Sequence, residues 1–122
     1  MRTVKVAIAG LGKVGSVFLD ALLEAGAHNI KVVAVAEPIE EKEAVRKAKE
    51  AGAGYFKDAR NLLEALGDEI DVLFDLTGDA VLRTELHEIL SRQSNRNTVI
   101  VPEKVAYLVW ALITKGEKVY PR

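Results

Sequence analysis

Cysteine is absent from this 122-residue sequence. Its absence excludes disulfides, thiolate catalysis and cysteine-based metal sites, and it is compatible with the cytoplasmic location that we expect. Histidine is also scarce, since the chain holds only His28 and His87. Neither histidine has further ligands at the spacing that a metal site requires. We therefore expect no metal ion and interpret both histidines as solvated side chains.

The sequence also lacks a charge excess and a long hydrophobic run. Its 17 basic and 18 acidic residues give a net charge of −1, which does not suggest a nucleic-acid-binding surface. The longest apolar run, Val105 to Ile113, is too short to span a bilayer. A segment typical of a strand begins almost at the N-terminus and leaves no room for a signal peptide. We expect one globular domain over residues 1–122, without nucleic-acid or membrane partners.

The most informative feature that is present is a glycine motif directly after an apolar segment. Residues 4–9 are typical of a buried strand, and Gly10, Gly12 and Gly15 follow with the spacing G-x-G-x-x-G. In a dinucleotide site, Gly10 permits the tight turn and Gly12 lets the pyrophosphate approach the backbone. Gly15 lets the following helix pack closely on the strand, and the free N–H groups at the start of that helix attract phosphates.

A second apolar segment, residues 32–36, ends on the acidic residue Glu37. Glu37 follows the glycines by about 20 residues, where a carboxylate accepts hydrogen bonds from the ribose hydroxyls of an adenosine. In the alternative interpretation, the glycines form only a tight turn and Glu37 is an ordinary solvated acid at a strand end. The strand pattern before the glycines and the helix pattern after them favour the dinucleotide.

Apolar segments of strand character alternate with helical patterns along the chain. We predict strands at about 4–9, 30–36, 55–56, 71–76 and 98–101, and helices at about 13–25, 39–51, 59–66, 78–91 and 102–114. Gly26 is expected to end the first helix, Pro38 to lie in the first turn of the second, and Asp58 to cap the third. This alternation predicts a single doubly wound α/β domain. Its parallel sheet has about five strands in the order 3-2-1-4-5, with helices on both faces.

Three segments carry a resemblance to a known family: residues 6–15, 33–37 and 71–78. They resemble the N-terminal nucleotide-binding domain of the glucose–fructose oxidoreductase and inositol dehydrogenase (Gfo/Idh/MocA) group. They are also similar to the cofactor domains of homoserine dehydrogenase and dihydrodipicolinate reductase. The resemblance covers residues 4–104 approximately, and it implies a Rossmann fold within an oxidoreductase.

The resemblance also implies how a dinucleotide would be held. The pyrophosphate turn would consist of Gly10, Leu11, Gly12, Lys13, Val14 and Gly15. Glu37 would hold the adenosine ribose, while Pro38 and Ile39 would line the adenine side. The wall after the fourth strand would consist of Leu76, Thr77 and Gly78.

Lys104 is the one candidate for a catalytic residue, and a weak one. The Gfo/Idh/MocA group carries a Glu-Lys-Pro motif after its fifth strand, and the lysine of that motif assists catalysis. This chain has Glu103-Lys104-Val105 at the matching place. Because the proline is missing and a catalytic lysine needs a closed pocket, a surface lysine is the preferred interpretation. The group also carries its substrate site on a C-terminal α+β domain, which we expect to be absent from this chain.

The last predicted helix is apolar on every face over Val105–Ile113. A helix that covers one side of a sheet needs only one apolar stripe, so the excess face should be buried against something else. We favour a second protomer in a homodimer or a missing C-terminal domain. The alternative is a helix held between the sheet and the C-terminal residues 119–121.

These observations predict an NAD(H)-binding domain of a dehydrogenase or related oxidoreductase. NAD is preferred to NADP because Glu37 would repel a 2′-phosphate and no arginine follows it directly, although Lys42 and Arg46 lie further along. The alternative function is a regulatory or sensor module that binds NAD(H) without catalysis of its own. The family resemblance favours the enzyme, whereas the lack of a substrate domain favours the sensor.

Overall fold

The computed structural model describes residues 2–24 and 29–116. Over these residues the chain forms one parallel sheet in the order β3-β2-β1-β4-β5. The strands are β1 (Val4–Ala9), β2 (Ile30–Ala36), β3 (Gly54–Phe56), β4 (Val72–Asp75) and β5 (Val99–Val101). The helices are α1 (Lys13–Glu24), α2 (Glu43–Glu50), α3 (Ala59–Leu66), the 3₁₀ helix η1 (Gly67–Glu69), α4 (Ala80–Arg92) and α5 (Glu103–Ile113). The predicted strand order and the predicted doubly wound Rossmann fold are thus confirmed.

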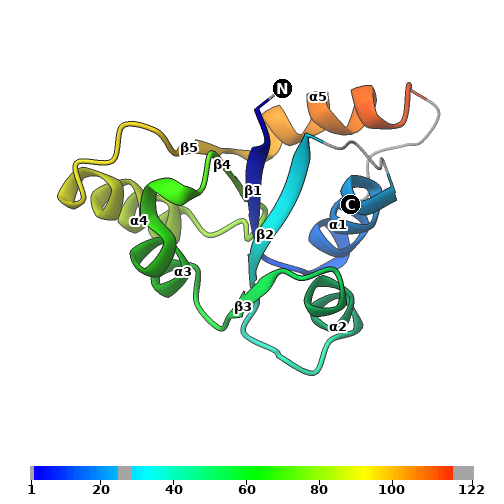
Figure 1. Ribbon diagram of the computed structural model, residues 1–122, viewed down its shortest axis with the longest axis horizontal. Helices are drawn as coiled ribbons and strands as arrows, with labels where there is room; N and C mark the ends of the chain where they lie inside the picture. Colours follow the sequence, from blue (N-terminus) through cyan, green and yellow to red (C-terminus); the bar gives the residue numbers. More distant parts are fainter. Residues whose placement is uncertain (1, 25–28, 117–122) are drawn as a thin grey trace.

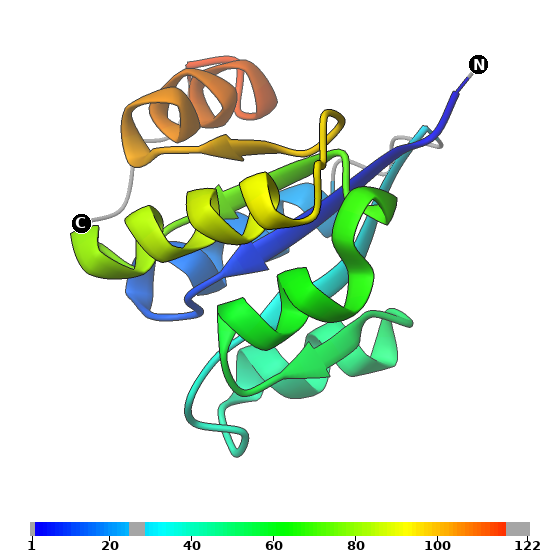
Figure 2. The same cartoon turned by 90° about the vertical axis from the view of Figure 1, so that its left-hand side faces the viewer.

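The helices cover the sheet in two layers (Figure 1). α1, α2 and α5 pack on one face, while α3 and α4 pack on the other. Figure 2 shows α3 and α4 in front of the strands, with α5 beyond the edge strand β5. This arrangement follows from right-handed crossovers between parallel strands, which place helices on both sides of the sheet.

Side-chain size differs between the two faces of the sheet. The core between the sheet and the helices α1 and α5 contains large and aromatic side chains. The ring of Phe18 lies 4.9 Å from that of Phe74 and 6.2 Å from that of Trp110. On the face toward α3 and α4, β1 and β2 present small residues, and these are Ala7, Ala9, Ala34 and Ala36. Successive residues of a strand point to opposite faces, so Val6 and Ile8 join the first core while their neighbours join the second.

One predicted helix begins at the wrong residue. The sequence predicted a helix from residue 39 with Pro38 in its first turn, but α2 begins at Glu43 and residues 38–42 form a turn. The physical reason is that the Ile39 N–H donates to the Glu37 carboxylate, which holds the chain away from helical geometry at this point. Extended backbone at Lys42 then directly precedes the helix.

The other predicted helix boundaries agree closely with the structure. Asp58 caps α3 by accepting a hydrogen bond from the Arg60 N–H at 2.8 Å, as predicted. The sequence also led to predictions about Gly26, His28 and residues 119–121. These residues lie outside the ranges that the structure describes. Within the described ranges, no helix is long and apolar enough to cross a membrane.

Candidate functional site

The turn after β1 has a geometry that requires glycine at two positions. Gly10 has a φ of +91°, in the region that residues with a side chain rarely adopt. A Cβ atom added to Gly15 would lie 1.8 Å from the Gly10 carbonyl oxygen. The first turn of α1 therefore packs directly on the end of β1, as the spacing of these glycines predicted.

Gly12 has a different environment, because no heavy atom of the described residues lies within 4 Å of the position that its Cβ would take. It borders open space at the N-terminus of α1. The N–H groups of Gly12, Lys13 and Val14 donate to no described residue. Free N–H groups and the positive end of the helix dipole make this turn a suitable site for a phosphate group.

Glu37 follows β2 and is buried, with 4% of its surface exposed. One carboxylate oxygen accepts the Leu11 N–H at 2.9 Å, and the other accepts the Ile39 N–H at 3.0 Å. The Lys42 ammonium lies 3.4 Å from the second oxygen. The alternative of an ordinary solvated acid is therefore wrong, because this carboxylate connects the glycine turn to the turn after β2. The first oxygen retains a lone pair, because it accepts one hydrogen bond and each carboxylate oxygen can accept two.

Asp75 organises the third turn of the site, after β4. Its carboxylate is fully buried and accepts hydrogen bonds from the Thr77 hydroxyl at 2.7 Å and the Thr77 N–H at 3.2 Å. Arg83 of α4 donates to its other oxygen at 3.2 Å. A Cβ on Gly10 would lie 3.1 Å from the Thr77 methyl group, so this turn lies directly against the glycine turn.

A cleft of about 400 Å³ opens between these three turns at the carboxyl edge of the sheet. It brings together six residues that the sequence predicted for the site: Gly10, Gly12, Glu37, Pro38, Leu76 and Thr77. Ala36, Leu76 and Leu82 supply apolar surface on which a flat ring can lie. The cleft thus combines N–H donors for phosphate, a carboxylate for hydroxyl groups and apolar walls for a base.

The remaining predicted residues lie outside this cleft. The Leu11 side chain is buried in the core beside α1, while Lys13 lines a neighbouring cleft. Ile39 is half exposed, and Gly78 lies between the lining residues Thr77 and Asp79 without lining the cleft itself. Lys104 lies exposed in the first turn of α5 and does not line the cleft.

Several lining residues were missed by the sequence analysis. They are Ala36, Lys42, Lys57, Asp58, Ala59, Arg60, Asp79 and Leu82. A signal for those after β3 was available, because the predicted order places β3 next to β2 and the carboxyl ends of parallel strands meet at one edge. Lys42 had no such signal, since its contact with Glu37 depends on the turn between them.

Charge on the β3 side of the cleft is concentrated at Arg60. Its guanidinium lies 2.9 Å from Asp58 and 2.9 Å from Glu85 of α4. The hydrogen bonds from Arg60 hold the pKa of the Asp58 carboxyl below its usual value. Asp58 is therefore ionised at neutral pH and suited to accept hydrogen bonds rather than to donate a proton. In the part of the chain that the structure describes, no cluster of three or more His, Asp or Glu residues could hold a metal ion.

Comparisons with known proteins identify the kind of domain to which this chain is similar. A family model described as the NAD-binding domain of homoserine dehydrogenase matches residues 10–112. Among curated proteins, (R,R)-butanediol dehydrogenase of Bacillus subtilis (strain 168) is 29% identical over 123 residues. The match covers 96% of this chain and 31% of that protein.

Solved structures show the same fold. A scyllo-inositol dehydrogenase from Lactobacillus casei, with bound NAD(H) and scyllo-inositol, superposes with a TM-score of 0.58 at 18% identity. The superposition covers 93% of this chain and 34% of that one. Saccharopine dehydrogenase (L-Glu forming) from Saccharomyces cerevisiae gives a TM-score of 0.59 at 23% identity, over 80% of this chain and 21% of that one.

This chain spans between about a fifth and a third of the length of these relatives. The family model covers the chain from Gly10, at the turn after β1, into α5. The chain belongs to the family of NAD-binding domains typified by that of homoserine dehydrogenase.

Proposed function

We propose that this chain is the NAD(H)-binding domain of an oxidoreductase, located in the cytoplasm. The observation that carries the proposal is the buried Glu37 carboxylate at the edge of the cleft, 2.9 Å from the N–H of the glycine turn. This position suits the hydroxyl groups of the adenosine ribose. The pyrophosphate would then lie over Gly12 at the start of α1, and the adenine would lie against Leu76 and Leu82.

The residues proposed to contact NAD(H) extend those predicted from the sequence. The pyrophosphate turn comprises residues 10–15, with contacts through the backbone of Gly12, Lys13 and Val14. Pro38 lines the adenosine side of the cleft. Ile39 and Gly78 flank the cleft, and we propose that they form part of its rim.

Catalysis by the whole protein would need residues beyond the cleft described here. Hydride transfer requires a substrate that is held against the nicotinamide ring by further side chains. Lys104, in the first turn of α5, remains the weak candidate on this chain. A second candidate function is an NAD(H) sensor without catalysis, and it is favoured by the exposed apolar face of α5, which could transmit occupancy to a partner.

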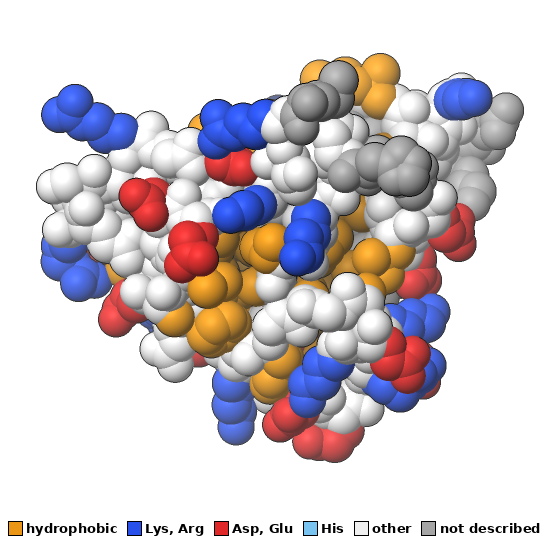
Figure 3. Space-filling view, viewed as in Figure 1, with side chains coloured by type: hydrophobic (Ala, Val, Ile, Leu, Met, Phe, Trp, Pro, Cys, Tyr) orange, Lys and Arg blue, Asp and Glu red, His pale blue; other side chains and the backbone are white. Residues whose placement is uncertain are grey.

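That face of α5 supports a proposal about assembly. Val105, Leu108 and Leu112 expose 44%, 61% and 70% of their surfaces, while Ala106 and Trp110 of the same helix are buried in the core. Figure 3 shows hydrophobic side chains on the outside of the molecule at the position of α5. We propose that a second protomer or a further domain of the same protein covers this face.

Calorimetric titration with NAD⁺, NADH and a 2′-deoxyadenosine analogue of NAD⁺ tests the proposed function. We expect the unmodified chain to bind NAD⁺ more tightly than the deoxy analogue, because Glu37 accepts a hydrogen bond from the hydroxyl that the analogue lacks. Glu37→Ala should weaken NAD⁺ binding by about tenfold or more and should remove the discrimination between the two ligands.

The deoxy analogue is the control that separates binding from folding. Glu37→Ala also leaves the N–H groups of Leu11 and Ile39 without their acceptor. This loss lowers stability and could weaken the binding of both ligands equally. Unchanged discrimination in Glu37→Ala would therefore refute the ribose assignment. Failure of the unmodified chain to bind any dinucleotide would refute the function itself.

A further inference from the structure

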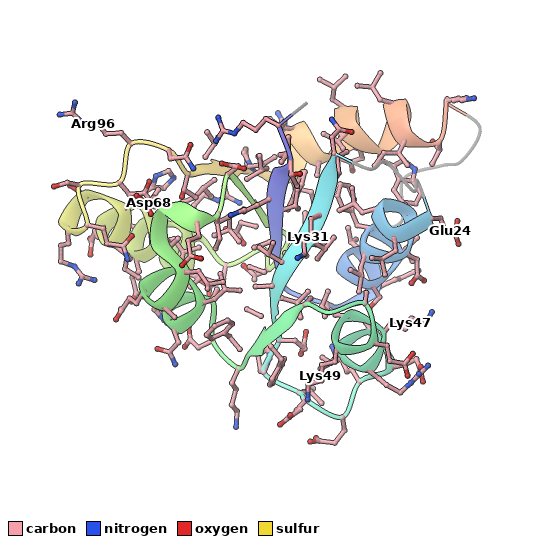
Figure 4. All side chains as sticks on the ribbon, viewed as in Figure 1. Glu24, Lys31, Lys47, Lys49, Asp68 and Arg96 are labelled. Atoms are coloured by element: carbon pink, nitrogen blue, oxygen red, sulfur yellow. The ribbon has the colours of Figure 1, made fainter. Side chains whose placement is uncertain are left out.

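The edge of the sheet beside β3 is only partly covered. β3 pairs with residues 34–36 at the end of β2, and no described residue pairs with residues 30–33 on that side. An uncovered strand edge presents backbone N–H and C=O groups that can pair with another extended segment. Figure 4 shows Lys31 on the front of β2, with α2 and α3 on either side. The first half of β2 is therefore an open strand edge.

Two lysine side chains lie next to each other at this edge. Lys5 of β1 and Lys31 of β2 are paired directly in the register of the two strands, and neighbouring strands lie only about 4.8 Å apart. Both residues are exposed, and neither side chain forms an ion pair or a hydrogen bond with any residue that the structure describes. Like charges on neighbouring strands repel each other, so an anion placed between them is attracted by both.

A cleft of about 230 Å³ lies between the two lysines and the end of α3. Its other lining residues are Val33, Leu66 and Glu69. Val33 and Leu66 are half-buried and give the cleft an apolar wall. Glu69 can balance only one of the two cations, so the cleft keeps a positive charge. Figure 3, in the same view as Figure 4, shows hydrophobic side chains exposed in the middle of this face. The cleft suits a carboxylate on a short apolar stem.

Protection of the open edge against self-pairing explains one of these lysines but not the other. A lysine on an exposed edge strand discourages pairing with a second copy of the chain, and Lys31 fits that role. Lys5 does not fit it, because β1 has a neighbouring strand on each side. A second copy would also bring the same two lysines to the edge. The charges therefore favour an acidic occupant over a second copy.

We propose that the open edge of β2 binds an extended acidic segment of a partner protein, which places a carboxylate side chain between Lys5 and Lys31. The backbone of this segment pairs with residues 30–33 as an added strand. The site lies at the amino ends of β1 and β2, whereas the dinucleotide cleft lies at the carboxyl edge of the sheet. The inference therefore does not depend on the proposed function, and the partner and a dinucleotide can be bound together.

The alternation of side chains along a strand defines the composition of this segment. Lys31 points to the face of α3, so Ile30 points to the opposite face, where it is 38% exposed. Acidic residues at every second position enter the cleft, with their stems against Val33 and Leu66. Apolar residues at the positions between them cover Ile30.

NMR titration of the chain with a short peptide of alternating Glu and Val tests the proposal. We expect saturable shifts of the backbone amide signals of Lys5 and residues 30–33, with a Kd of about 1 mM or tighter. A peptide with Gln in place of each Glu should bind about tenfold more weakly, because it brings no charge to the lysines. Methylation of the backbone N atoms of the Glu–Val peptide keeps every carboxylate but prevents strand pairing, and should weaken binding to a similar extent.

Substitution of the lysines provides a second test. Lys5→Gln and Lys31→Gln should each raise the Kd for the Glu–Val peptide about threefold, and the double variant should raise it about tenfold. Added salt should also weaken binding to the unmodified chain. Lys13→Gln is the matched control, because it removes the same charge from an exposed lysine at the start of α1 that does not line this cleft. It should leave the Kd unchanged.

Several outcomes would overturn the inference. One is the absence of saturable shifts at residues 30–33 with about 5 mM of the Glu–Val peptide. Another is equally tight binding of the methylated peptide or of free glutarate, which would assign the cleft to small carboxylates instead of an added strand. An equal effect of Lys13→Gln would show that only the net charge matters. The comparisons between peptides use the unmodified chain, so they test the inference even if a lysine variant does not fold.

Discussion

Gly12 and Gly15 belong to one motif, but the surroundings of the two positions differ. A Cβ on Gly15 would collide with the backbone oxygen of Gly10 at 1.8 Å, whereas a Cβ on Gly12 would meet nothing within 4 Å. Gly15 is therefore required by the fold itself. Gly12 is required only if a ligand approaches the backbone there.

This difference yields a prediction from two alanine substitutions. Gly15→Ala should lower the free energy of unfolding by about 2 to 4 kcal/mol, because α1 must move away from β1. Gly12→Ala should change stability by less than about 1 kcal/mol but weaken NAD⁺ binding by at least about tenfold. Thermal unfolding and calorimetric titration measure both effects. Normal NAD⁺ affinity in Gly12→Ala would contradict a pyrophosphate at this turn.

The position of Glu37 was predictable from the sequence, but its surroundings were not. Spacing from the glycines indicated an acid at the end of β2. The hydrogen bonds that it accepts from Leu11 and Ile39 depend on how two distant turns meet, which no local pattern records. The same tertiary dependence kept Lys42 out of the predicted site.

At the scale of elements, local interactions explain which boundaries were predictable. Asp58 caps α3 through a hydrogen bond to a residue two positions away, so the sequence itself contains the whole interaction. α2 begins later than predicted because the Glu37 side chain captures the Ile39 N–H. Pro38 fits the first turn of a helix by its own geometry, but the acid before it determines the path of the chain.

Asp71 connects three elements at the opposite edge of the sheet from the cleft. Its carboxylate accepts the Lys5 N–H of β1 at 2.9 Å and the side-chain amide of Asn97, before β5, at 2.8 Å. Arg2 lies 3.0 Å away. The hydrogen bond from the Lys5 N–H, followed by that from Asn97, lowers the pKa of the Asp71 carboxyl.

This lowered pKa predicts a pH dependence of stability. The contribution of Asp71 should be fully present above about pH 3.9, the pKa of an unfolded aspartate, and should be lost as the pH falls through the lower folded pKa. Asp71→Asn should therefore be less stable than the unmodified chain at neutral pH, and the difference should shrink toward about pH 2. Urea unfolding at several pH values measures this difference. A difference that stays constant with pH would contradict the assignment.

At the scale of the whole molecule, the exposed face of α5 predicts self-association if a second protomer covers it. We expect the isolated chain to dimerise at micromolar concentration, and Leu108→Glu and Leu112→Glu to shift it to the monomer by placing a charge in the contact. Sedimentation velocity measures the effect. Val81→Glu is the control, because Val81 is 68% exposed on α4, away from this face. A monomer at about 100 µM would exclude the homodimer and favour a further domain on the same face.

Leu11 has a consequence for the way in which the domain meets its ligand. Its side chain lies in the core, its N–H is held by Glu37, and its carbonyl oxygen accepts hydrogen bonds from Ser16 and Lys42. The glycine loop is therefore anchored in the middle before any nucleotide arrives. Its conformational entropy is lost during folding and not at the moment of binding, so association needs no rearrangement of this loop. The domain meets the dinucleotide as a preorganised receptor.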